Sequence, residues 1–149
     1  MKLISIDKRL LALYCEADEQ VLYKDGRPVV LVVKLKYAGI MRDFAVPLRS
    51  NISPLAKRDE YFALPNRSNT KPYHHHGLHY TKMMPISKKF YQLYRLDKDA
   101  EERRYLAMID KNEKRIIAEC QRYLNDYEAG QRQMFATDLD KLLAVLQSC

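Results

Sequence analysis

The fold is decided by the stretch PVVLVVKLKYAG, residues 28–39, together with its continuation IMRDFAVPL, residues 40–48. The stretch begins as an unbroken apolar run and ends in alternation, which predicts a strand from Pro28 to Lys36 that leaves the core at one end. Ala38-Gly39 predicts a turn, and Met41 to Leu48 predicts an antiparallel return strand. The segments 23–27 and 49–51 are therefore expected to converge as turns at the open end of this hairpin.

Patterns on either side of the hairpin predict the remaining elements. Alternation predicts strands, and apolar residues three and four positions apart predict helices. Before the hairpin we expect a strand at 3–6 and a helix that is capped by Asp7, runs to Tyr14 and has leucines 10, 11 and 13 facing inward. After it we expect a loop at 66–72 and two strands within 78–96, with Pro85 at an edge or bend. A long helix should run from a capping box at Asp99 and Glu102 to Gly130, and a last helix should begin at Thr137.

Length and charge limit the class of protein. A chain of 149 residues has the size of one domain, here 1–149. Its formal net charge of +7 and pI near 9.3 favour a polyanionic partner. Nucleic acid is expected rather than a membrane, because no apolar run approaches the roughly 20 residues of a spanning helix. Widely spaced cysteines and the lack of a signal-peptide pattern predict reduced thiols and a cytoplasmic location.

The segment between Glu60 and Asp97 contains no Asp or Glu, and it holds all four histidines. Its lysines and arginines offer charges to phosphates, and its tyrosines and phenylalanines offer rings on which unpaired bases stack. The mixture favours RNA or single strands over duplex DNA. The plainer interpretation is a basic surface that keeps the protein soluble. With the nearby strand ends, the predicted RNA-binding residues are Arg49, Asn51, Arg58, Lys71, His76, Tyr80, Lys82, Lys88 and Lys89.

The run His74-His75-His76, with His79, raises the question of a metal site. Consecutive side chains on an extended segment cannot converge on one ion, Gly77 interrupts a helical register, and no carboxylate is near in sequence. No metal and no other cofactor is expected. A histidine here could act as general acid or base, because its pKa lies near neutrality, or as a stacking surface. The other interpretation that stays open is a surface loop rich in imidazoles at His74 and His75.

Chemistry is expected at the open end of the hairpin, where Tyr23 and Arg27 face the segment around Ser50 and where Lys57 follows downstream. A metal-independent ribonuclease needs groups that deprotonate the ribose 2′-hydroxyl, protonate the leaving 5′-oxygen and stabilise the phosphorane, because the substrate supplies the nucleophile. Arg, Lys, Ser, Tyr and His side chains suffice. A Ser-Asn pair after a strand is also typical of a turn or helix cap, and that interpretation stays open.

The order and spacing of several sequence elements resemble one family of toxins. The elements are a short strand before a basic helix (8–14), a Tyr-x-x-x-Lys/Arg element (23–27) before an aliphatic strand, a return strand ending in Pro-Leu-x-Ser (47–50), a Met-x-Pro-Ile element (83–86) and a long helix with a Tyr-x-x-x-Ile/Leu pattern. Over most of its length the chain resembles the toxins of type III toxin–antitoxin systems, the ToxN/AbiQ-type endoribonucleases.

The resemblance implies an α+β fold, with a strongly twisted antiparallel, partly barrel-like sheet packed with helices and a long helix in the C-terminal half. It implies metal-free RNA cleavage that leaves a 2′,3′-cyclic phosphate and a 5′-hydroxyl, and a role in phage defence. The implied partners are cellular RNA and a short repeat antitoxin RNA, folded as a pseudoknot. The toxin processes this RNA, which inhibits it within a closed protein–RNA hetero-oligomer.

The family's functional positions can be carried over where the motifs match. Ser50 matches the active-site serine, Tyr23 matches the tyrosine, and Arg27 occupies the place usually held by lysine. These three residues, with Lys57 and His79, are the predicted catalytic set.

The chain also departs from the family pattern at two positions. Arg49 stands where the prototype has a threonine, and Ile52 stands where a lysine is expected. The missing cation is expected from Lys57 or from the histidine-rich segment. Because an arginine at the lysine position stabilises a phosphorane but is a poor general base, proton transfer is expected from His76 or His79.

Two other classes of function remain as alternatives. A non-enzymatic RNA-binding or translation-associated module would use the same basic, aromatic face without cleaving. A metal-dependent nuclease would lose activity on chelation, and the lack of a carboxylate cluster in the sequence argues against it.

Overall fold

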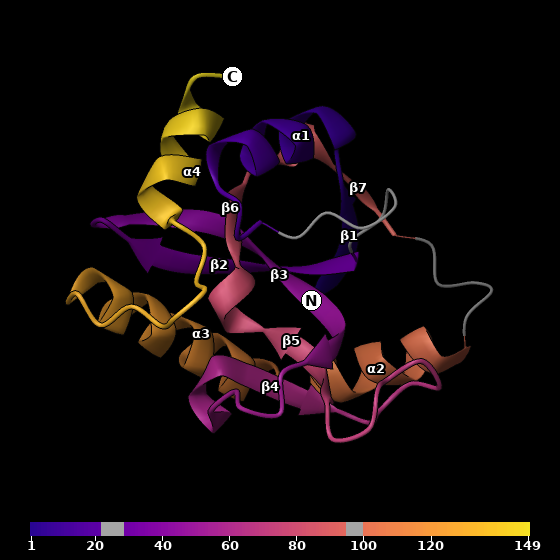
Figure 1. Cartoon of the computed structure of the whole chain (residues 1–149). Helices are drawn as coiled ribbons and strands as arrows, with labels where there is room; N and C mark the ends of the chain where they lie inside the picture. Colours follow the sequence, from indigo (N-terminus) through magenta and orange to yellow (C-terminus); the bar gives the residue numbers. More distant parts are fainter. Residues whose placement is uncertain (22–28, 95–99) are drawn as a thin grey trace.

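The computed structural model describes residues 1–21, 29–94 and 100–149 (Figure 1). Its strands are β1 (Lys2–Ile6), β2 (Val29–Tyr37), β3 (Ile40–Ile52), β4 (Tyr61–Leu64), β5 (His75–His79), β6 (Met84–Ile86) and β7 (Tyr91–Leu93). Its helices are α1 (Lys8–Ala17), α2 (Ala100–Lys111), α3 (Glu113–Glu128) and α4 (Leu139–Gln147), with short 3₁₀ turns η1 (Arg58–Glu60), η2 (Tyr80–Lys82) and η3 (Lys88–Phe90).

The strands form one antiparallel sheet built around β3. Their order is β4-β5-β3-β2-β1-β7, and β6 also pairs with β3. Strand β3 pairs with β2 along residues 40–47, with β6 along 43–45 and with β5 along 48–52. The α+β class and the antiparallel sheet are confirmed. The sheet is open, with β4 and β7 as its edges in the described part of the chain, and is not closed into a barrel.

The predicted β2–β3 hairpin is present and its turn follows the expected chemistry. Ala38 and Gly39 have φ of +53° and +78°. Positive φ at both central residues is typical of the two-residue turns whose twist matches that of the flanking strands. Tyr37 therefore pairs with Ile40 beside the turn, and the register continues without a shift to Val30 opposite Pro47.

Helices cover both faces of the sheet, so the core has two parts. Figure 1 shows α1 and α4 on one side of the sheet and α2 and α3 on the other. Alternate residues of β2 divide between them, because Val30 packs with the α1 and α4 residues whereas Leu31 packs with those of α2 and α3. This division explains the unbroken apolar run, since a strand buried on both faces needs apolar residues at every position.

The end of β3 differs from the prediction. The return strand was expected to stop at Leu48, but β3 continues to Ile52 because β5 supplies backbone partners for residues 48–52. Residues 49–51 are therefore strand and not turn, and the facing segment 23–27 lies outside the described residues. His75, which was considered for a surface loop, also lies in a strand, because β5 begins there. The region 78–96 contributes parts of three strands where two were predicted.

The predicted long helix is divided in two. Asn112 separates α2 from α3 with φ −110° and ψ 20°, and its side-chain amide donates to the carbonyl of Met108 at 2.8 Å, which competes with helical hydrogen bonding. Gly130, at φ +89°, follows the end of α3 as predicted. The expected cap Asp99 lies outside the described residues.

Two smaller expectations also change. Leu13 is 44% exposed, because the inward face of α1 is made by Leu10, Leu11 and Tyr14. Asp138, not Thr137, caps α4, since its carboxylate accepts a hydrogen bond from the backbone of Lys141.

Candidate functional site

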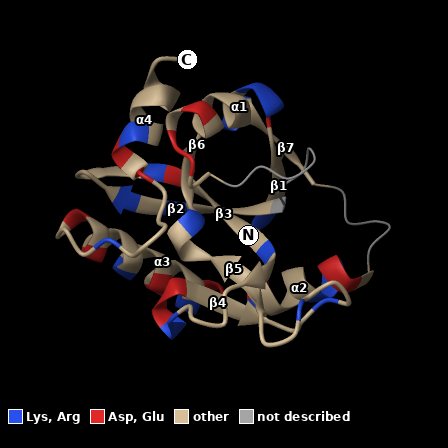
Figure 2. Cartoon of the chain, in the orientation of Figure 1, with Lys and Arg blue, Asp and Glu red and all other residues tan. Residues whose placement is uncertain are grey.

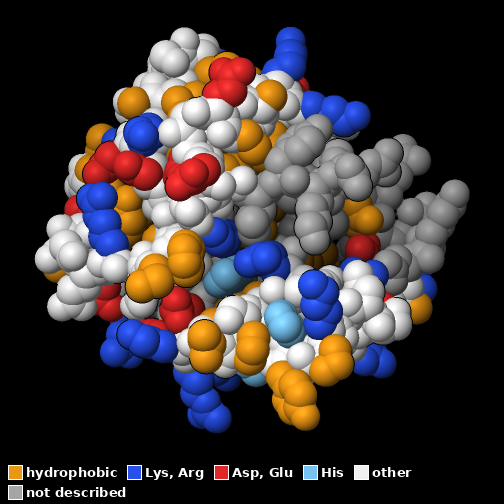
Figure 3. Space-filling model, in the orientation of Figure 1, with side chains coloured by type: hydrophobic (Ala, Val, Ile, Leu, Met, Phe, Trp, Pro, Cys, Tyr) orange, Lys and Arg blue, Asp and Glu red, His pale blue; other side chains and the backbone are white. Residues whose placement is uncertain are grey.

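The acid-free part of the chain runs along β3. Two strands of this segment, β5 and β6, pair antiparallel with β3, and η2 connects them. The pairing begins at Ile52 opposite His75 and ends at Asp43 opposite Ile86. Figure 2 shows no acidic residue along β5, η2 and β6. Figure 3 shows a hollow in the middle of this face, over β3, β5 and η2, in which basic and histidine side chains gather. This surface is the candidate site.

A β-bulge places Ser50 at the site. Arg49 pairs with Gly77 and Ile52 pairs with His75, so Ser50 and Asn51 together stand opposite one residue. A bulge interrupts strict alternation, and residues 48–51 are accordingly all partly exposed. The side-chain oxygen of Asn51 accepts the backbone N–H of Lys71 at 2.8 Å, which fastens the bulge to the loop before β5. The sequence predicted a catalytic role for Ser50, which stays a prediction, and it did not predict the bulge.

Arg49 and His79 form the central contact of the site. The Arg49 guanidinium lies 3.2 Å from Nδ1 of His79. Because a guanidinium only donates, Nδ1 is the acceptor and the proton of the neutral imidazole is on Nε2. Nε2 then donates to the Thr81 hydroxyl oxygen at 2.9 Å. The site therefore holds a neutral histidine between an arginine and a threonine.

The charges around His79 keep it neutral. Its side chain is only 7% exposed, and burial, followed by the positive charges of Arg49 and Lys82, lowers its pKa from 6.5 to about 3. Burial also lowers the pKa of Arg49. At neutral pH the imidazole is thus an acceptor that orients the guanidinium.

Lys82 is buried at the edge of the site. Its ammonium donates to the backbone and side-chain oxygens of Gln20, at 3.2 and 3.0 Å, and to the carbonyl of Phe135 at 2.7 Å. Burial and the charge of Arg49 lower its pKa to about 8, against the opposing effect of Asp18. The sequence predicted that Lys82 binds RNA, and this stays a prediction. The structure shows that its ammonium joins three distant parts of the chain.

Gly77 allows β4 and β5 to approach closely beside Arg49. A Cβ at this position would lie 2.0 Å from the backbone oxygen of Phe62. Real Cβ atoms do not approach a backbone oxygen so closely, so glycine is required for packing and not for its φ.

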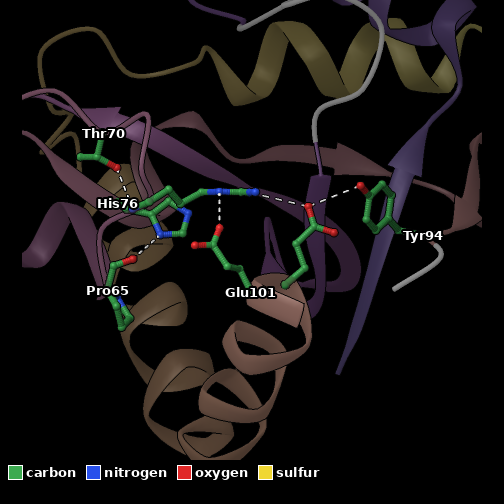
Figure 4. Close-up of polar contacts among 7 residues, drawn as sticks. Pro65, Thr70, His76, Tyr94 and Glu101 are labelled. Atoms are coloured by element: carbon green, nitrogen blue, oxygen red, sulfur yellow. Dashed lines mark hydrogen bonds and ion pairs between the residues drawn. The ribbon is translucent and has the colours of Figure 1, made fainter. Parts of the chain in front are cut away.

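His76 points to the opposite side of β5 and is a structural residue. It is 2% exposed, its Nδ1–H donates to the carbonyl of Pro65 at 2.9 Å, and its ring packs on Tyr105 of α2 with centroids 4.6 Å apart. Figure 4 shows the hydrogen bond between His76 and Pro65 beside an ion-pair network. In that network Arg67 lies 3.5 Å from Glu101 and 3.7 Å from Glu102. Together these contacts tie the 65–74 loop to α2.

Comparison with solved structures identifies the fold. One structure, from work on a processed non-coding RNA that regulates a bacterial antiviral system, matches with a TM-score of 0.80 and 18% identity, covering 100% of this chain and 99% of that chain. A second, from work on a bacterial type III toxin–antitoxin system whose toxin is selectively inhibited by a non-coding RNA pseudoknot, matches with a TM-score of 0.72 and 18% identity over 99% and 96%. The lactococcal anti-phage endoribonuclease AbiQ, of the type III system, matches with a TM-score of 0.67 and 15% identity over 99% and 97%.

The chain has the fold of the type III toxins. The resemblance noted in the sequence is confirmed at the level of fold, along the whole chain. No protein-family model matches the sequence, and no match is found among curated protein sequences. The function is therefore argued below from the site.

The remaining predicted residues are spread over this fold. Tyr80 is fully buried, and its hydroxyl donates to Glu119 at 2.8 Å, so it offers no stacking surface. The backbone N–H of Lys57 donates to the carboxylate of Glu60 at the start of η1. Lys89 lies 3.4 Å from the backbone oxygen of Cys149, beyond the end of α4. Further positions are as follows: Arg58 lines a pocket of about 250 Å³ against α3, Lys88 is exposed in η3, and Tyr23 and Arg27 lie outside the described residues.

The type III toxin fold also brings in residues that sequence reasoning missed. Thr81, Gln20 and Phe135 supply the hydrogen-bonding partners of His79 and Lys82. Only Thr81 had a local signal, two residues from a histidine. The partners of Lys82 lie 62 and 53 residues away in the sequence, where no spacing pattern points to them.

Two further searches cover the described residues alone. None of their helices is long and apolar enough to cross a membrane. No group of three or more His, Cys, Asp or Glu side chains among them is arranged to hold a metal ion.

Proposed function

We propose that this protein is the toxin of a type III toxin–antitoxin system, an endoribonuclease that is inhibited by a cognate repeat RNA and acts in the cytoplasm in phage defence. The observation that carries the proposal is the Arg49–His79 contact beside the bulged Ser50, on a fold shared along its length with an RNA-regulated antiviral protein and with an anti-phage endoribonuclease. The net charge of +7 and the absence of Asp and Glu between residues 61 and 96 suit an RNA partner.

The proposed reaction is transesterification without a metal. The ribose 2′-oxygen loses its proton and forms a bond to the adjacent phosphorus, and the bond from phosphorus to the 5′-oxygen breaks as that oxygen takes up a proton. The products are a 2′,3′-cyclic phosphate and a 5′-hydroxyl. Arg49 is suited to the phosphorane, since His79 engages one of its N–H groups and a guanidinium carries five. Ser50 is proposed to donate a hydrogen bond to the same phosphate.

Proton transfer is assigned away from His79. A group with a pKa of about 3 is mostly neutral near pH 7 and is a weak base, and its Nδ1 lone pair already accepts from Arg49. We assign His79 the positioning of Arg49. His76, expected beside His79 as a proton-transfer group, packs on Tyr105 instead. We therefore propose Tyr23 and Lys57, the other titratable members of the predicted catalytic set, for proton transfer, and keep the guanidinium of Arg27 for the phosphorane.

The decisive test is cleavage of a mixed RNA pool by the purified protein in excess EDTA, followed by mapping of the new ends. New ends with 5′-hydroxyls are expected with the wild-type protein and not with Ser50→Ala. Ser148→Ala, which removes a hydroxyl at the far end of α4, is the matched control and should cleave normally.

Other outcomes have definite meanings. RNA that shifts on a gel but stays intact, after any co-purified RNA is removed, would favour the non-enzymatic binding module. Cleavage that stops in EDTA would replace the proposed chemistry with metal catalysis. Loss of both folding and binding in Ser50→Ala would make Ser50 structural.

The proposal extends to the partner. We propose a short repeat antitoxin RNA, folded as a pseudoknot, that the toxin processes and that closes into a protein–RNA hetero-oligomer. Light scattering of the protein purified with its repeat RNA should give a mass of several protein–RNA pairs. A mass of one protein chain with one RNA would refute the closed assembly.

A further inference from the structure

Phe135 is exposed in a conformation that phenylalanine rarely adopts. Its side chain is 67% exposed and its φ is +63°. It is the third residue of a turn closed by a hydrogen bond from the N–H of Ala136 to the carbonyl of Gln133, and a positive φ at that position favours glycine or asparagine. The chain thus carries a large apolar ring on the surface where a small residue is preferred.

The turn is fastened to η2 and to the residue after it, at Phe135 and at Thr137. The buried ammonium of Lys82 donates to the carbonyl of Phe135 itself at 2.7 Å. Two residues later, the backbone N–H of Thr137 donates to the carbonyl of Thr81 at 3.0 Å, and the Thr137 hydroxyl donates to that of Met83 at 2.6 Å. These contacts hold the strained backbone in place and so fix the point from which the ring projects.

The turn of Phe135 borders the basic site. Thr81 joins the two, because its carbonyl accepts the N–H of Thr137 and its hydroxyl oxygen accepts from His79, which contacts Arg49 at 3.2 Å. Figure 3 shows apolar side chains over the α3–α4 connection, directly beside the hollow with the basic and histidine side chains. A strand whose phosphate lies on Arg49 would bring an adjacent base to this border.

We propose that Phe135 is a base-stacking subsite, on which an unpaired nucleobase of the single-stranded RNA substrate stacks next to the phosphate bound at Arg49. The inference rests on the proposed function and adds a specific contact to it. Aromatic rings beside a positive groove are the general means of holding single strands, because every base has a flat face. Stacking also explains an exposed ring that contributes little to packing.

The test is fluorescence of 2-aminopurine placed at successive positions of a single-stranded RNA with 2′-O-methyl groups, which cannot be cleaved by transesterification. With wild-type protein, one position should be quenched on binding. Phe135→Leu should abolish that quenching and weaken binding about 5- to 100-fold. Leu93→Ala is the control, because Leu93 is equally exposed, at 67%, but lies in β7 at the opposite end of the sheet from β5.

A second variant separates stacking from a structural role. Phe135→Gly relieves the positive φ, so its denaturation midpoint should equal or exceed that of the wild type while its RNA affinity falls. Loss of stability together with affinity would make the ring structural and overturn the inference. Unchanged quenching and affinity in Phe135→Leu would also overturn it, while leaving the proposed function standing. Failure of the wild-type protein to bind RNA would overturn both.

Discussion

The wild-type protein is expected to lose stability as the pH falls from about 6.5 to about 5, and replacement of His79 by glutamine should make this loss smaller. In the unfolded chain the imidazole takes up a proton at its ordinary pKa of 6.5, whereas in the folded protein burial and the charges of Arg49 and Lys82 lower the pKa to about 3. Between these two pKa values the unfolded state binds more protons. Stability is therefore complete above pH 6.5 and falls as the pH decreases toward 3.

The size of the effect follows from the same shift. Each pH unit between the two pKa values changes the free energy of unfolding by about 1.4 kcal/mol for one proton. From about pH 6.5 to about pH 5, His79 should therefore cost the protein about 2 kcal/mol, a substantial part of the stability of a domain of this size. Glutamine does not titrate, but its carbonyl can accept from Arg49 and its amide can donate to Thr81.

The assay is urea denaturation of the wild type and of His79→Gln at several pH values in this range. The difference between their free energies of unfolding should change by about 2 kcal/mol from the upper to the lower pH. His74→Gln, in the loop before β5, is the matched control for removal of an imidazole. Parallel pH dependences for the wild type and His79→Gln would refute the buried, neutral histidine and with it the assigned hydrogen bond from Arg49.

Three further predictions address the same surface. Gly77→Ala should destabilise the protein by about 1–3 kcal/mol in urea denaturation, because the new Cβ meets a backbone oxygen of β4; an unchanged midpoint would contradict that packing. Lys82→Met should cost about 1.5–3 kcal/mol in the same assay, since it removes the charged donor from three oxygens, and full stability would show that the ammonium is dispensable. A phosphate bound near Arg49 should raise the pKa of Lys82 above about 8, so the lysine should take up a proton when RNA binds near pH 8.5. Calorimetry of RNA binding in buffers of different ionisation enthalpy should detect this proton uptake. Equal heats in all buffers would place the phosphates away from Lys82.

Local signals predicted the framework well where a single physical rule governed the segment. The β2–β3 hairpin followed from an apolar run and Ala38-Gly39, and both turn residues have the required positive φ. Helical spacing predicted that one face of the long helix is buried. Its predicted members are Leu106, Ile109, Ile116, Ile117, Cys120, Leu124 and Tyr127, of which Leu106 is only partly buried and Ile117 is 36% exposed. The break at Asn112 was missed because the spacing of apolar residues continues across it, whereas the break depends on one side-chain hydrogen bond.

The arrangement of the site was less predictable, because contacts between residues far apart in the sequence determine where its side chains lie. Ser50 was selected by its position after a strand, but the strand continues through it because β5 arrives from a separate part of the chain. His76 and His79 seemed equivalent in the sequence. Strand alternation and the packing of α2 direct His76 to the core and His79 to Arg49. The role of Lys82 in RNA binding stays a prediction, and its burial as a donor was not foreseen because its partners have no local signature.

The concentration of positive charge at this site has an energetic consequence for the free protein. Burial, followed by the charges of Arg49 and Lys82, lowers the pKa of His79, and burial, followed by the charge of Arg49, lowers that of Lys82. The repulsion between the positive charges of Arg49 and Lys82 opposes folding, and the negative charge of Asp18 partly offsets it at Lys82. A bound phosphate would reverse its sign, since the same cations would then attract an anion in a partly buried setting where charges interact strongly. The two cations that repel each other in the free protein, Arg49 and Lys82, would thus both attract the phosphate of the proposed RNA.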